Sequence, residues 1–86
     1  MYATFNERFQ KQYKKAPLNI RSAWNERFYL FLKDPTHPFL HNHALHGSYE
    51  GKRSINITGD WRALYQQYSS NRIIFIALGT HSQLYK

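Results

Sequence analysis

Hydrophobic positions near the start of the chain recur at helical spacing. From Asn6 to Lys15, apolar side chains return at every fourth position, as an amphipathic helix requires, at Phe5, Phe9 and Tyr13. A second helix is predicted in APLNIRSAWNERFYLFLKDP, which has an apolar stripe of Ile20, Trp24, Phe28, Phe31 and Leu32. Since only Ala16 and Pro17 separate the two, we expect an antiparallel helix pair, preceded by a short extended segment over residues 1–4.

The second half of the chain has the pattern of β-strands. KRSINI and WRALYQQY alternate between apolar and polar residues, whereas RIIFIALG is a nearly continuous apolar run, typical of a central strand. Ser69, Ser70 and Asn71 supply the turn between the last two strands. The preceding segment, THPFLHNHALHGSYEG, has no helical period and is predicted as a loop that enters a strand near residues 45–49.

This order of elements predicts the fold class. Two helices followed by strands with short turns indicate an α+β domain, in which an N-terminal antiparallel helix pair packs on one face of a three- to four-stranded, mainly antiparallel sheet. The 86 residues suffice for one core and not for two, so we expect a single domain over residues 1–86. The opposite face of the sheet is expected to be open and to carry the function.

Charge narrows the class of partner. Twelve Lys and Arg residues against five Asp and Glu give a net charge of +7, which favours nucleic acid as the partner, with an acidic protein or simple solubility as the alternatives. The absence of cysteine excludes a disulfide framework and a thiolate metal cage. Neither a secretory leader nor a membrane-spanning run is evident, so we expect a cytoplasmic protein with no membrane partner.

Histidines concentrate in HPFLHNHALH, at His37, His41, His43 and His46. No cysteine or nearby carboxylate completes a metal site there, and the letters HNH alone carry no nuclease signature, so we expect no metal. An imidazole suits proton transfer near neutral pH, so either some of these side chains act on a nearby anion or the loop is merely solvated. His81 follows the apolar strand and is either a catalytic group at a strand end or a surface histidine.

Cations and aromatic residues interleave over the β half of the chain. Guanidinium groups bind phosphate through two hydrogen bonds and aromatic faces stack on bases, so this pattern favours single-stranded RNA over ordinary sheet composition. The residues are Lys52, Arg53, Arg62 and Arg72, among Tyr49, Trp61, Tyr65, Tyr68 and Tyr85. Asp60 either orients a histidine or arginine, acts as a base, or is a turn residue in TGDW.

The chain resembles the RelE/ParE superfamily of bacterial toxins, and it is most similar to the YafQ-type branch. The resemblance rests on the order of elements and on the stretches LHGSYEGKRSINITGDWRALY and IIFIALGTHSQLYK. Three motifs carry the resemblance: Leu-x-Gly at 45–47, Asp-Trp at 60–61 and Gly-Thr-His at 79–81. The resemblance implies the toxin of a type II toxin-antitoxin pair, with a cognate antitoxin as partner. It further implies a ribosome-dependent endoribonuclease that cuts mRNA by attack of the ribose 2′-OH on the adjacent phosphate, without a metal or other cofactor.

The same resemblance implies roles for individual residues. His43 matches the histidine before Leu-x-Gly, Arg62 a phosphate-contacting arginine, and Arg53 falls near a catalytic lysine of the RelE-like pattern. Asp60, Trp61, His81 and Tyr85 match the remaining motif positions. We therefore predict a catalytic set of His43, Asp60, His81 and Arg62, with His81 as general acid and Asp60 or His43 receiving or orienting the 2′-OH proton. The predicted RNA-binding set is Arg53, Lys52, His46, Trp61 and Tyr85.

Two positions depart from the YafQ-like pattern, which has a histidine where this chain has Asn56 and an arginine where it has Ala77. Our hypothesis is that Arg62 and His46 compensate. The alternatives are a ParE-like inhibitor of DNA gyrase and an inactive homologue that binds RNA or protein. In a regular strand Trp61 and Arg62 point to opposite faces, so either Arg62 lies on the open face with Trp61 against the helices, or an irregular start of the strand brings both to the site. We favour the first arrangement.

Overall fold

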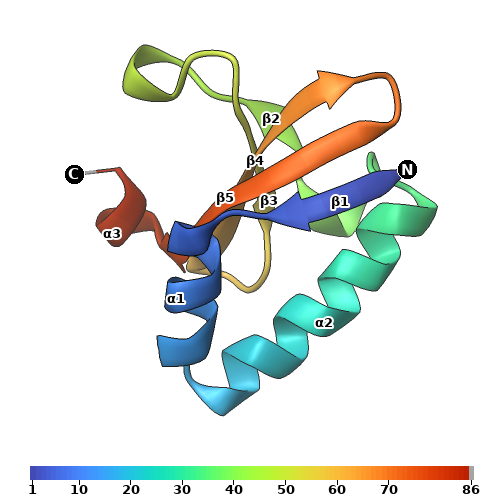
Figure 1. Cartoon of the computed structure of the whole chain (residues 1–86). Helices are drawn as coiled ribbons and strands as arrows, with labels where there is room; N and C mark the ends of the chain where they lie inside the picture. The colour runs from blue at the N-terminus through green and yellow to red at the C-terminus, as the bar shows by residue number, and fades with distance from the viewer. Residues whose placement is uncertain (86) are drawn as a thin grey trace.

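A five-stranded sheet organises the computed structural model, which describes residues 1–85 (Figure 1). Its strands lie in the order β1-β5-β4-β3-β2. They are β1 (Tyr2–Phe5), β2 (His43–Ala44), β3 (Arg53–Asn56), β4 (Trp61–Ser69) and β5 (Arg72–Thr80). β1 runs parallel to β5 and every other neighbouring pair is antiparallel, so the α+β class and the mainly antiparallel sheet are confirmed. The sheet is larger than expected because β1 and β2 form its two edges.

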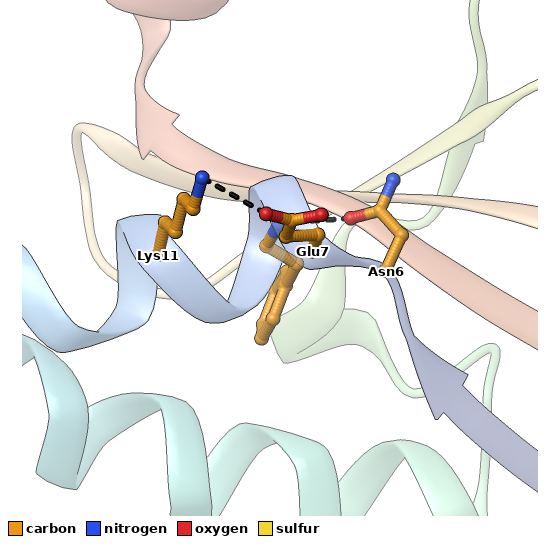
Figure 2. Close-up of polar contacts among 4 residues, drawn as sticks. Asn6, Glu7 and Lys11 are labelled. Carbon is orange, nitrogen blue, oxygen red and sulfur yellow. Dashed lines mark hydrogen bonds and ion pairs between the residues drawn. The ribbon is translucent and has the colours of Figure 1, made fainter.

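Both predicted helices are present, as α1 (Glu7–Lys15) and α2 (Leu18–Lys33). The Asn6 side chain accepts the N–H of Phe9 at 2.8 Å and so caps α1, while Glu7 and Lys11 form an exposed ion pair at 2.9 Å (Figure 2). An exposed pair contributes little stability, so the cap and the apolar face define this helix. The two helices lie on one side of the sheet and diverge from their short connection (Figure 1).

The main core lies between these helices and the sheet, with Phe75 of β5 at its centre. Six aromatic rings surround Phe75, with ring centroids 4.9 to 5.8 Å from its own: Phe5, Phe9, Trp24, Phe28, Phe31 and Tyr65. Burying one large apolar side chain contributes roughly 1.5–3 kcal/mol, so this cluster is a principal source of stability. The same cluster holds the helices against one face of the sheet and leaves the other face available for a functional site.

The opposite face is not simply open, which corrects the expectation from sequence. Between β4 and β5 the register shifts, because Leu64 pairs with Ala77 and Tyr65 pairs with Phe75, leaving Ile76 as an extra residue. This β-bulge turns Ile76 and Ala77 to the same side. A second cluster forms there from Leu45, Leu64, Ala77 and Leu84, with Tyr49, Ile76 and Tyr85 packed on it. A hollow lies beside this cluster on the same face.

Three short helices complete the described chain. They are η1 (Pro38–Leu40) and η2 (Gly47–Tyr49), both 3-10 helices, and α3 (His81–Leu84). The strand predicted near residues 45–49 is therefore wrong, because Gly47 has a φ of 67° and the chain turns into η2 there. α3 was not predicted, since four residues carry no measurable period. Among residues 1–85 no helix is long and apolar enough to cross a membrane.

Candidate functional site

A hollow of about 470 Å³ lies beside the second cluster, on the sheet face away from α1 and α2, and we call it the histidine hollow. Four of the chain's five histidines line it, and no Asp or Glu does so among residues 1–85. Its lining residues are His41, His43, Ala44, Leu45, His46, Asn56, Arg62, His81 and Tyr85. A lining whose ionisable groups can carry only positive charge, apart from Tyr85, suits an anion such as a phosphodiester.

His43 lines the histidine hollow with one of its ring nitrogens bonded to the backbone. Its Nδ1 lies 2.8 Å from the carbonyl oxygen of His41. A carbonyl oxygen only accepts hydrogen bonds, so Nδ1 carries the proton. In the neutral ring Nε2 is then unprotonated, and it makes no hydrogen bond within the described residues. β2 places this residue opposite Ser54 of β3, so the strand pairing directs the ring into the hollow.

Arg62 sits across β3 and β4 from Asn56, with which it pairs in the sheet. Its Nη1 donates to three carbonyl oxygens of the preceding turn, those of Thr58 at 3.2 Å, Gly59 at 3.1 Å and Trp61 at 3.2 Å. The other guanidinium edge, formed by Nε and Nη2, donates no hydrogen bond within residues 1–85. That edge has the parallel N–H geometry which binds two oxygens of one phosphate.

His81 is held in place by the Gly-Thr-His motif. Thr80 caps α3, because its hydroxyl accepts the N–H of Gln83 at 3.2 Å while the Gln83 side chain accepts the N–H of Thr80 at 2.9 Å. Gly79 leaves room for α3 to pack closely, since a Cβ there would lie 3.3 Å from Leu84 Cδ2. The His81 N–H donates to the carbonyl of Asp60 at 3.0 Å, which ties α3 to the turn before β4.

Most of the predicted site residues meet at the histidine hollow. His43, His46, Arg62, His81 and Tyr85 line it together. The Tyr85 ring packs against that of His81 at a centroid distance of 4.7 Å. The residues therefore come from β2, β4, α3 and the loops beside them.

Four predicted residues lie outside the hollow. Trp61 packs on the main core, on the helix side as expected from strand alternation. The Asp60 carboxylate is exposed and accepts no hydrogen bond from any described residue, so its observed contact is made by its backbone. Arg53 donates from Nε to Asn42 Oδ1 at 2.8 Å, and Lys52 is half-buried away from the lining. The structure therefore separates these side chains from the imidazoles.

Two polar lining residues were not among the predicted set. His41 lies two residues before His43 and lines the hollow with it, but its left-handed backbone means that no strand alternation in the sequence signalled this position. Asn56 occupies the position where the YafQ-like pattern has a histidine, and it does line the hollow. Ala77, the second departure, is fully buried beside Leu64, so its position contributes packing and no charge. Within residues 1–85, no group of three or more side chains is arranged to hold a metal ion.

Comparison with known proteins gives one family. The family described as "Bacterial toxin of type II toxin-antitoxin system, YafQ" matches residues 1–86. YafQ from E. coli has a similar structure, with a TM-score of 0.83 at 20% identity over 99% of this chain and 98% of that chain. The same protein in the E. coli DinJ-YafQ complex gives a TM-score of 0.72, at 20% identity over 99% of this chain and 98% of that one.

Two other bacterial toxins have the same fold. A copper-bound mutant toxin from Helicobacter pylori is 31% identical, with a TM-score of 0.78 over 99% of each chain. A YoeB/ParE toxin from Agrobacterium tumefaciens is 19% identical, with a TM-score of 0.76 over 94% of this chain and 99% of that chain. No curated protein sequence matches the chain significantly.

Proposed function

The chain belongs to the YafQ toxins of bacterial type II toxin-antitoxin systems, within the RelE/ParE superfamily, and we propose that it is an endoribonuclease that cleaves mRNA on the ribosome. The observation that carries the proposal is the convergence of an unprotonated imidazole nitrogen, a free guanidinium edge and a second imidazole on one hollow without acidic residues. Cleavage of RNA by its own 2′-OH requires a base for the 2′-OH, a cation for the charge on the phosphate and an acid for the departing 5′ oxygen, and these three groups can supply them.

His43 is the general base of this proposal. The ring lines the histidine hollow and its Nε2 is unprotonated in the neutral form, so it can accept the proton of a ribose 2′-OH. Asp60 was the other candidate for this role. Its exposed carboxylate lies outside the lining, which favours His43. The 2′ oxygen then forms a bond to phosphorus while the bond to the 5′ oxygen breaks.

Arg62 and His81 act on the other two sites of developing charge. The free Nε and Nη2 edge of Arg62 donates to the non-bridging phosphate oxygens, whose negative charge increases as the phosphorane forms. Protonated His81 gives its proton to the departing 5′ oxygen. The products are a 2′,3′-cyclic phosphate and a free 5′-OH, and the proton taken by His43 balances the one lost by His81. Tyr85, packed on His81, offers a face on which a base can stack.

The proposed partners follow from charge and family. With a net charge of +7, the chain attracts the phosphate backbones of mRNA and ribosomal RNA. The E. coli DinJ-YafQ assembly is a toxin-antitoxin complex, and we propose that this chain likewise binds a cognate antitoxin, with an acidic segment that covers the histidine hollow.

The experiment uses the purified full chain with ribosomes programmed with one defined mRNA, and the same mRNA alone. Cleavage sites are mapped by primer extension, and the new ends are tested for direct labelling by a polynucleotide kinase, which requires a 5′-OH. His81→Ala is expected to abolish cleavage. The matched control is His37→Ala, because His37 caps η1 and lies outside the hollow.

Other outcomes would replace the proposal. Fragments with 5′-phosphate ends would exclude 2′-OH attack. Intact mRNA together with inhibition of purified DNA gyrase would support the ParE-like alternative. Equal cleavage by His81→Ala and the wild-type chain would remove His81 from the mechanism.

A further inference from the structure

We propose that Arg53 and Asn42 are positioning residues that fix the tautomer and direction of His43, an inference that rests on His43 being the base in the proposed function. Arg53 was predicted to bind RNA, yet its Nε donates to Asn42 Oδ1 at 2.8 Å and it does not line the histidine hollow. Arg53 therefore holds the side chain of Asn42, which lies next to His43 in the chain.

The side-chain amide of Asn42 makes three hydrogen bonds. Oδ1 accepts from Arg53, while Nδ2 donates to the carbonyl of Pro35 at 3.0 Å and to the hydroxyl of Tyr65 at 2.8 Å. A guanidinium only donates and a carbonyl only accepts, so these partners permit one orientation of the amide. Because Arg53 is charged, its bond is stronger than one between neutral groups. We call these four residues the amide clamp.

The amide clamp determines which way the neighbouring imidazole of His43 points. Tyr65 belongs to the main core, so Asn42 is held toward the helix side of the sheet. Side chains of consecutive extended residues alternate, so with Asn42 held on the helix side, His43 at the start of β2 faces the histidine hollow. A slip of one residue in the pairing of β2 with β3 would turn the His43 ring away from the hollow.

The clamp also supports the strained residue that sets the tautomer. His41 has φ 46° and ψ 48°, a left-handed conformation that is unfavourable for a residue with a Cβ. This conformation directs the His41 carbonyl to Nδ1 of His43 at 2.8 Å. The bond from Asn42 to Pro35 closes the loop that contains His41, so the clamp holds the backbone where the strain occurs.

The test reads the tautomer of His43 directly, by ¹⁵N NMR of the imidazole nitrogens in the full chain without RNA. In the wild-type chain we expect the Nδ1–H form. In Arg53→Met and in Asn42→Ala we expect a shift toward the Nε2–H form, which an unconstrained imidazole prefers. Arg53→Lys, which keeps a charged donor, should retain the Nδ1–H form. Arg72→Met is the matched control, because it removes one exposed charge at the start of β5, away from the hollow.

Kinetics give the second readout. Misplacement of a catalytic group on the scale of 1 Å costs up to about a hundredfold, so Arg53→Met should lower kcat for ribosome-bound mRNA roughly tenfold to a hundredfold. If Arg53 instead bound the phosphate of the RNA directly, Arg53→Met would lower kcat but would leave the His43 tautomer of the free protein unchanged.

The two readouts separate the two proposals. If the wild-type chain does not cleave RNA, the proposed function fails, while the NMR comparison still tests the clamp. The inference is overturned if His43 keeps the Nδ1–H form in both Arg53→Met and Asn42→Ala, with amide spectra showing that they are folded. Should Asn42→Ala not fold, Arg53→Met decides alone, because methionine preserves the volume of this half-buried side chain.

Discussion

Arg62→Lys separates the positive charge of this residue from the geometry of its guanidinium. The five N–H donors of arginine are divided in the structure. Nη1 donates to the carbonyls of Thr58, Gly59 and Trp61, while Nε and Nη2 donate to no described residue. Lysine has a single nitrogen. It can bond the turn carbonyls or the phosphate, and it cannot present two parallel donors while it holds the turn.

The magnitude follows from this division. Loss of one preorganised contact to transition-state charge costs about 2–4 kcal/mol, which corresponds to a decrease in kcat of roughly 30- to 1000-fold. The net charge of +7 is unchanged, so the general attraction to RNA and therefore KM should stay near the wild-type value. Each hydrogen bond to the turn contributes only about 0.5–1.5 kcal/mol, so the fold should survive the exchange while kcat falls.

The assay is single-turnover cleavage of ribosome-bound mRNA over a range of ribosome concentrations, with circular dichroism as the check of folding. Arg72→Lys is the matched control, because it makes the same exchange at an exposed site on β5 outside the histidine hollow. If folded Arg62→Lys keeps kcat within about threefold of the wild-type value, the bidentate geometry is not required and the argument fails.

Three further predictions concern the second cluster, the cap of α3 and the main core. Ala77→Arg restores the arginine of the YafQ-like pattern at a fully buried position. It should lower the melting temperature sharply, because an unpaired charge and a larger side chain enter a packed cluster. A melting temperature equal to that of the wild type would contradict this reasoning. Thr80→Val removes the capping hydroxyl at nearly constant volume. It should lower the free energy of unfolding in urea by about 1 kcal/mol and lower kcat, because His81 is held less firmly. An unchanged kcat would show that the cap does not position this imidazole. Phe31→Ala truncates a side chain with no exposed surface and should cost about 3–5 kcal/mol in the same unfolding assay, and a cost below about 1 kcal/mol would mean that the site relaxes to fill the cavity.

Residue patterns were sufficient for most of the fold. The four-residue spacing of Phe5, Phe9 and Tyr13 and the stripe in the next segment located both long helices, because an apolar stripe is a local property of the chain. The continuous apolar run of β5 likewise identified a central strand. The β2 edge was misplaced, because the left-handed φ of Gly47 turns the chain into η2. That conformation depends on contacts which neither propensity nor alternation reports.

The candidate site was predictable in part. The resemblance named His43, Arg62, His81 and Tyr85, and the hypothesis of compensation added His46. These residues do gather at one hollow, although their roles stay predictions.

The sequence by itself determined the family, the α+β class, the excess of positive charge and the side of the sheet to which Arg62 points. These depend on residue identity, short spacings and strand alternation. Only the tertiary structure decided that the bulge at Ile76 builds a second cluster, that Arg53 binds Asn42 and that the His41 carbonyl selects the His43 tautomer. A hydrogen bond between two side chains depends on where separate segments meet in space, and a single sequence without that geometry does not specify its partners.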